Sequence, residues 1–164
     1  MRGRAEIAGG GIAGLATGLA LARRGWQVRV HEQDSDLRIL GAGIYIWENG
    51  LKVLEALGVL DAAIAGALPV RRRERRGPDG RLIGAEDFGG PGARLYVPLR
   101  RSLLTALADG LRDAGGEIVF RSRVTAASAD GEIEFADGGS AAADLVIGAV
   151  LIPGAAAPKL VKRT

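Results

Sequence analysis

The stretch that decides the fold is Arg4–Gln33, "RAEIAGGGIAGLATGLALARRGWQVRVHEQ". Ala5–Ala8 is a short apolar run that ends at glycines, as a buried parallel strand does. Apolar residues then recur at helical spacing over Ile12–Arg24, which predicts a helix. Valines alternate with polar residues over Gln27–His31, which predicts a second strand. The order strand, helix, strand is that of a βαβ unit in a parallel sheet.

The glycines between the first strand and the helix match the phosphate-binding pattern G-x-G-x-x-G. In that pattern Gly9 allows a sharp turn, Gly11 lets a pyrophosphate approach the backbone, and Gly14 lets the helix lie close to the strand. A helix N-terminus offers free N–H groups and a partial positive charge to phosphate oxygens. Ile12 and Ala13, which open the helix, are therefore candidate ligands as well. The alternative is a strand–turn–helix that binds nothing.

Glu32 stands at the end of the second strand, about 20 residues beyond the turn, where a carboxylate can bind both hydroxyls of a ribose. Its negative charge disfavours a 2′-phosphate, and therefore NADP. Gln33 follows it and is a further candidate cofactor ligand. The neighbouring His31 could stack on an adenine, but a place at the strand end without a ligand is the preferred interpretation.

The composition argues against several other kinds of site. The 164 residues are 48% hydrophobic and 25% charged, which is ordinary for one globular domain. Cysteine is absent and His31 is the single histidine, so neither a disulfide framework nor a metal site is expected. No acid–base constellation stands out, and the catalytic residues stay unassigned.

Two segments raise the question of a nucleic-acid or membrane partner, and neither is expected. Five arginines fall in "RRRERR", Arg71–Arg76, but the run lacks interleaved aromatic residues and leads into the turn "GPDG". A solvated hairpin is therefore favoured over a nucleic-acid site. The apolar stretch Ile7–Ala22 is shorter than a typical spanning helix, is broken by glycines and continues into a strand pattern. A cytoplasmic protein without a membrane segment is expected.

The rest of the chain alternates helical and extended patterns. Leucines at helical spacing predict helices over Glu48–Leu57 and Arg100–Ala114. Val70–Arg76 and Arg81–Ile83 flank "GPDG" as two antiparallel strands. Short strands separated by turns follow and end in a buried strand at Leu145–Ala149. The predicted fold class is α/β, a Rossmann-like parallel sheet with a β-hairpin and a β-meander.

The chain resembles the N-terminal part of the class A flavoprotein aromatic hydroxylases, which have the para-hydroxybenzoate hydroxylase fold. The resemblance covers about residues 4–149 and is strongest up to Asp61, through the glycine pattern, "VRVHEQ", "LRILGAGIYIW" and "NGLKVLEALGVLD". It is greatest to the branch that includes 2-methyl-3-hydroxypyridine-5-carboxylate oxygenase. The resemblance implies FAD as the cofactor, whereas the glycines and Glu32 by themselves also allow NAD.

The resemblance also implies site residues. It assigns the glycines to the pyrophosphate of FAD and Glu32 to the adenosine ribose. Arg38, in "LRILGAG", matches a position near the FAD phosphates and ribityl chain, and Arg100, in "RRSLLTAL", matches an arginine that reaches FAD. Val124 matches a position whose backbone meets the adenine. Without the resemblance, the two arginines would be interpreted as surface charges or as residues that begin a helix.

The chain departs from the family after residue 149. Where the family continues "ADLVIGADG", this chain reads "ADLVIGAVLIPG", and residues 150–164 resemble an NAD-domain segment of alanine dehydrogenases and the related transhydrogenase subunit. The sequence thus predicts an FAD-binding domain over 1–149 and a short tail over 150–164 that caps the sheet. Such a seam suggests a recombined or designed chain, and the alternative is a divergent natural protein.

The family's later flavin-side motif has no counterpart in these residues. We therefore expect a truncated FAD-binding domain with little or no hydroxylase turnover. The alternatives are an active NAD(P)H-dependent flavin monooxygenase or oxidoreductase, an NAD-binding module, and a designed fold without a ligand. Exposed sheet edges near Arg71–Arg76 and the tail could pair two copies into a homo-oligomer, because unpaired strands invite association.

Overall fold

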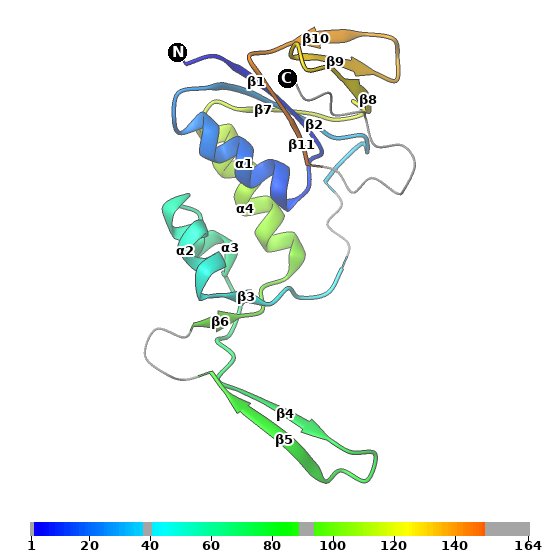
Figure 1. Ribbon diagram of the computed structural model, residues 1–164. Coiled ribbons are helices and arrows are strands. Elements are labelled where there is room, and N and C mark those ends of the chain that lie inside the picture. Colours follow the sequence, from blue (N-terminus) through cyan, green and yellow to red (C-terminus); the bar gives the residue numbers. More distant parts are fainter. Residues whose placement is uncertain (1, 38–40, 89–93, 150–164) are drawn as a thin grey trace. The chain divides into compact units, whose positions relative to one another are not determined.

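The computed structural model describes residues 2–37, 41–88 and 94–149 (Figure 1). Within these ranges the chain forms two compact units. The first unit contains the residues up to 39 and those from 107 onward, and the second contains 40–106. Each unit is described by itself.

The first unit is built on a four-stranded parallel sheet with the order β11-β1-β2-β7. The strands are β1 (Arg4–Ala8), β2 (Gln27–His31), β7 (Glu117–Val119) and β11 (Leu145–Gly148), and α1 (Ile12–Ala22) joins β1 to β2. Because β1 lies between β2 and β11, its apolar residues are covered on both edges as well as by the helix. The predicted βαβ unit and the final parallel strand are confirmed.

Helix α1 lies against one face of this sheet at close range. Gly18 is buried in the contact, and a Cβ atom there would come 3.1 Å from Val30 Cγ2 and 3.5 Å from Ile7 Cδ1. Leu15 and Leu19 on the same side of the helix are fully buried. Each such side chain contributes about 1.5–3 kcal/mol through its removal from water. This packing fixes the helix axis and with it the position of the helix N-terminus.

A three-stranded antiparallel sheet in the order β10-β9-β8 lies on the other side of the parallel sheet (Figure 1). It consists of β8 (Val124–Ala127), β9 (Glu132–Phe135) and β10 (Ser140–Ala142), and it is the predicted β-meander. The strand before it, β7, is not part of the meander. It pairs in parallel with β2, with Ile118 beside Val30. Such a pairing needs a long crossover between the two strands, which a local pattern does not reveal.

The second unit contains short helices, a short strand pair and the predicted β-hairpin. Its elements are β3 (Ile46–Trp47) paired with β6 (Leu95–Tyr96), α2 (Glu48–Ala56), α3 (Leu60–Ala63), β4 (Arg72–Arg76) paired with β5 (Leu82–Asp87), and the first half of α4 (Arg100–Asp113). The single turn α3 was not expected from the sequence. The two longer helices begin where the leucine spacing predicts them and end one residue earlier.

All five residues of β4 are exposed, and Arg72, Arg73 and Arg76 pair with acidic side chains. Arg73 binds Glu86 of β5 at 2.6 Å, while Glu74 lies between Arg72 at 3.0 Å and Arg76 at 2.6 Å. The arginine run is therefore a solvated hairpin with internal charge pairing. Among the described residues, no helix has the length and the apolar character that crossing a membrane requires.

Candidate nucleotide-binding site

The turn between β1 and α1 explains two of the motif glycines in different ways. Gly9 has φ +108°, and its N–H donates to the His31 carbonyl at 2.8 Å. A Cβ atom on Gly14 would overlap the Gly9 carbonyl oxygen, so only glycine fits there without a backbone shift. A Cβ atom on Gly11 would have nothing within 4 Å. Gly14 is thus required by the fold, whereas Gly11 borders open space.

The N-terminus of α1 offers donors to this open space. The first intrahelical hydrogen bond runs from the Leu15 N–H to the Gly11 carbonyl at 3.0 Å. The N–H groups of Ile12, Ala13 and Gly14 precede it and have no helical acceptor within the described chain. No acidic residue lies in the first turn of the helix. An anion can therefore bind to these donors, helped by the helix dipole.

The Glu32 carboxylate lies beside the same turn. Its Oε2 accepts a hydrogen bond from the Gly10 N–H at 2.9 Å, and its Oε1 accepts one from the Asp34 N–H at 3.1 Å. Because each carboxylate oxygen has two lone pairs, both oxygens can still accept a hydroxyl. A ribose diol next to a pyrophosphate therefore fits the donor and acceptor groups that this site presents. Gln33, the next residue, is exposed.

Gly10 is a further candidate position, which the motif did not single out. A Cβ atom there would come within 2.8 Å of Glu32 Oε2 and 2.9 Å of Glu32 Cβ. Any larger residue would displace the carboxylate. The signal in the sequence was the run of three glycines, because the motif by itself needs only its first and third members.

The end of β2 is held by the backbone on the side of β7. The Glu32 N–H donates to the Val119 carbonyl at 2.8 Å, and the Glu32 carbonyl accepts from the Ser122 N–H at 2.9 Å. These bonds fix Glu32 just beyond the carboxyl ends of β1 and β2. Ligands of open parallel α/β sheets bind at this edge.

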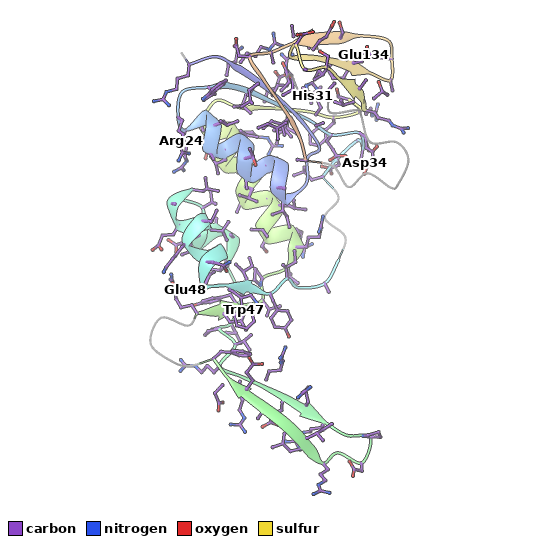
Figure 2. All side chains as sticks on the ribbon, in the orientation of Figure 1. Arg24, His31, Asp34, Trp47, Glu48 and Glu134 are labelled. Atoms are coloured by element: carbon purple, nitrogen blue, oxygen red, sulfur yellow. The ribbon has the colours of Figure 1, made fainter. Side chains whose placement is uncertain are left out.

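The face of the sheet opposite α1 contains a buried polar group (Figure 2). Glu6 and His31 are 0% and 3% exposed, and His31 Nε2 lies 2.6 Å from Glu6 Oε2. Arg4 Nε donates to the other Glu6 oxygen at 2.7 Å, and His31 Nδ1 lies 2.8 Å from Ser122 Oγ. The His31 ring also contacts Phe135, with ring centroids 4.7 Å apart. Both ring nitrogens of His31 are thus engaged by protein groups.

This environment changes the acidity of Glu6. Burial disfavours its charged form, but the hydrogen bonds and charges of His31 and Arg4 outweigh burial and lower the pKa of Glu6 from its ordinary value. The sequence did not predict this group, because a single glutamate in a five-residue strand resembles an ordinary exposed position.

The other predicted ligands are either outside the described residues or on elements that do not form the β1–α1 turn. Arg38 and residues 150–164 lie outside the described residues. Arg100 begins α4 in the second unit, where a Cβ atom on Gly41 (φ +136°) would come 3.2 Å from Arg100 Cδ. Gly41 therefore lies beside the start of this helix. Val124 begins β8 in the first unit, opposite Phe135.

Comparison with known proteins identifies the family. The family model described as "FAD binding domain" matches residues 4–146. The chain belongs to this family. The FAD-binding domain is 43% identical to the 2-heptyl-3-hydroxy-4(1H)-quinolone synthase of Mycobacteroides abscessus over 148 residues, which are 90% of this chain and 40% of that protein. It is 34% identical to 3-amino-4-hydroxybenzoate 2-monooxygenase PtmB3 of Streptomyces platensis, over 90% of this chain and 39% of that protein.

A solved structure agrees. The tetrameric form of 2-methyl-3-hydroxypyridine-5-carboxylic acid oxygenase superposes on the FAD-binding domain with a TM-score of 0.82 and 40% identity, over 87% of this chain and 38% of that one. The chain thus spans about two-fifths of the length of these relatives. The predicted resemblance to the N-terminal part of the aromatic hydroxylases and the prediction of FAD are confirmed. The assignments of individual residues stay predictions.

Proposed function

We propose that this FAD-binding domain binds the ADP portion of FAD at the β1–α1 turn. The observation that carries the proposal is the Glu32 carboxylate, which the Gly10 N–H holds beside the open N-terminus of α1. A carboxylate next to free N–H groups matches a ribose diol attached to a pyrophosphate. NAD and other nucleoside diphosphates contain the same two groups, so the choice of FAD rests on the family.

Each group of residues has a role in this proposal. The turn at Gly9, Gly11 and Gly14, with the first-turn residues Ile12 and Ala13, surrounds the pyrophosphate. Outside the turn, the ligands are Glu32 for the adenosine ribose, Gln33 beside it, Val124 for the adenine, Arg38 for the phosphates and ribityl chain, and Arg100 for a part of FAD that the resemblance does not specify. The family resemblance supports the last three assignments.

For the 164 residues by themselves we propose cofactor binding with little or no hydroxylase turnover. No acid–base constellation stands out in the sequence, and the chain spans about two-fifths of its relatives. The second candidate function is that of an NAD(P)H-dependent flavin monooxygenase or oxidoreductase. The names of the relatives favour it, because one is a 2-monooxygenase and another an oxygenase. NADH consumption and ring hydroxylation, measured with FAD added, would separate the two candidates.

Three further assignments are also proposals. We place the protein in the cytoplasm, because it lacks cysteine and its apolar segment continues into a βαβ unit. We assign residues 1–149 to the domain and 150–164 to a capping tail. Self-association through exposed strands is supported by the all-exposed strand β4 and by the tetrameric relative. Light scattering on the purified protein tests the self-association.

The binding proposal is tested by titrating the protein with FAD and following flavin fluorescence. The unaltered chain should bind in the micromolar range or tighter, and Glu32→Ala should weaken binding about tenfold, because it removes hydrogen bonds to a charged acceptor. Glu134→Ala, an exposed change on β9, is the matched control. Equal affinity of the Glu32→Ala variant and the control would disprove the ribose assignment.

The two glycines provide a second test. Gly11→Ala should leave the unfolding midpoint unchanged, because the added methyl meets no atom, but should weaken FAD binding by occupying the space for the pyrophosphate. Gly14→Ala should lower both stability and affinity, since its methyl overlaps the Gly9 carbonyl. Unchanged FAD affinity of Gly11→Ala would place the pyrophosphate elsewhere.

A further inference from the structure

The buried pair Glu6–His31 is adjacent to the proposed ribose ligand along the chain. His31 is the last residue of β2, and Glu32 follows it directly. The side chains of Glu6 and His31 emerge on the same face of the sheet. Ala8 is the register partner of His31, and Glu6 lies two residues before Ala8 on the same strand. The contact between Glu6 and His31 is thus a diagonal cross-strand pair at the end of the strand that presents Glu32.

Ser122 connects this pair to Glu32 itself. Its hydroxyl lies 2.8 Å from His31 Nδ1, and its N–H donates to the Glu32 carbonyl at 2.9 Å. On the other side, the Gly9 N–H donates to the His31 carbonyl at 2.8 Å. The path from Arg4 through Glu6, His31 and Ser122 therefore ends at the backbone of Glu32.

A gain in stability does not by itself explain why Glu6 and His31 are buried together. Two buried polar side chains lose their hydration, and apolar residues of similar volume are often as stable or more stable. Buried polar pairs can instead select one arrangement, because their hydrogen bonds demand a defined geometry. A ribose ligand needs a defined geometry, since small displacements weaken hydrogen bonds.

We propose that Glu6 and His31 are positioning residues for the cofactor, which hold the end of β2 so that the Glu32 carboxylate stays beside Gly10 and meets the ribose hydroxyls. The inference rests on the proposed function of Glu32. Arg4 completes the group by neutralising the second oxygen of Glu6. The pair does not contact the nucleotide, and its effect passes through Glu32.

The test compares ADP with 2′-deoxy-ADP, which lacks one ribose hydroxyl, by calorimetric titration of the full chain. The unaltered protein should prefer ADP about tenfold, because a hydrogen bond to a carboxylate is lost with the deoxy ligand. Glu6→Gln should reduce this preference, and Glu32→Ala should abolish it. Adding Glu6→Gln to Glu32→Ala should change neither affinity further. A merely structural role of Glu6 would weaken both ligands equally and leave their ratio intact.

Glu117→Gln is the matched control. It breaks the exposed ion pair between Arg29 of β2 and Glu117 of the neighbouring strand β7, in which Arg29 Nε lies 2.8 Å from Glu117 Oε2. It should leave the ratio of affinities unchanged. If Glu6→Gln does not fold, Ser122→Ala removes the hydroxyl partner of His31 while keeping the backbone bond to Glu32, and it should reduce the ratio in the same direction.

The outcomes separate the two proposals. If Glu32→Ala lowers the preference for ADP but Glu6→Gln and Ser122→Ala leave it intact, the positioning role is wrong and the ribose assignment stands. If Glu32→Ala leaves affinity and preference intact, both are wrong. Independent losses in the Glu6→Gln/Glu32→Ala double variant also overturn the positioning role.

Discussion

Two regions of the molecule pair a carboxylate with a basic side chain at the same distance and with opposite exposure. In the parallel sheet, Glu6 Oε2 and His31 Nε2 lie 2.6 Å apart with side chains that are 0% and 3% exposed. In the β4–β5 hairpin, Glu86 and Arg73 also meet at 2.6 Å, but their side chains are 52% and 54% exposed. The distance between the two charged groups therefore does not show how much the pair contributes to stability. Its exposure to water determines that contribution.

The physical difference lies in the unpaired state. An exposed charge that loses its partner is hydrated again, so the hairpin pairs contribute little. A buried group that loses its partner finds neither water nor another acceptor, so its loss is costly even though the intact pair gains little over apolar residues. Replacing one residue of each pair and comparing the loss of stability is thus the direct test of the difference between the two regions.

The largest effect is expected for Glu6→Leu. It should lower the free energy of unfolding by about 3 kcal/mol, because His31 and Arg4 both lose the carboxylate that they contact and face an apolar side chain instead. Chemical denaturation measures the change. Glu86→Leu in the hairpin is the control and should leave the unfolding midpoint where it is. Equal effects of the two substitutions would contradict the comparison.

Acidification should also act on the sheet. The pKa of Glu6 is lower in the folded protein than in the unfolded chain, so its ionised form stabilises the fold at pH values above the unfolded pKa. This contribution is lost as the pH falls through the lower, folded pKa. Glu6→Gln has no carboxyl to protonate at this position. Unfolding curves between pH 6 and about pH 3 should therefore fall less steeply for Glu6→Gln than for the unaltered chain. Parallel curves would show that Glu6 does not contribute.

Replacing both members of the buried pair should cost much less than replacing one. Glu6→Leu/His31→Leu removes both polar groups, and its stability should lie within about 1 kcal/mol of the unaltered chain. The single and double variants are compared in one denaturation series. A double variant as unstable as Glu6→Leu would mean that packing, and not the unpaired polar group, causes the loss.

The smallest effect is expected for salt acting on the hairpin. Raising the ionic strength to 1 M shortens the screening length to about 3 Å, which weakens exposed pairs and leaves buried ones nearly unchanged. Hydrogen exchange should become slightly faster at the amides of β4 and β5 and stay constant in β1 and β2. Faster exchange in β1 would indicate that the buried pair is reached by solvent ions.

Much of the first unit follows from local patterns in the sequence. The apolar run, the helical spacing and the alternation of valines each predicted the right element, because each of these patterns reflects a local period. The limits of β2 are those predicted, whereas β1 begins one residue earlier and α1 ends two residues earlier than predicted. The confirmed FAD family rests on a much longer stretch, residues 4–146. The pairing of β7 with β2 was missed, since nothing in "EIV" distinguishes a parallel partner from a meander strand.

By itself the sequence determined the βαβ unit, the glycine turn and the acid at the end of β2. Those features depend on residue types at short spacing, where backbone sterics and side-chain period act directly. Only the tertiary structure decided that Gly10 must be small to accommodate Glu32, and that Glu6 and His31 share a buried hydrogen bond. Both depend on atoms that come from residues more than 20 positions apart, and their energies arise from the exclusion of water, which no local pattern encodes.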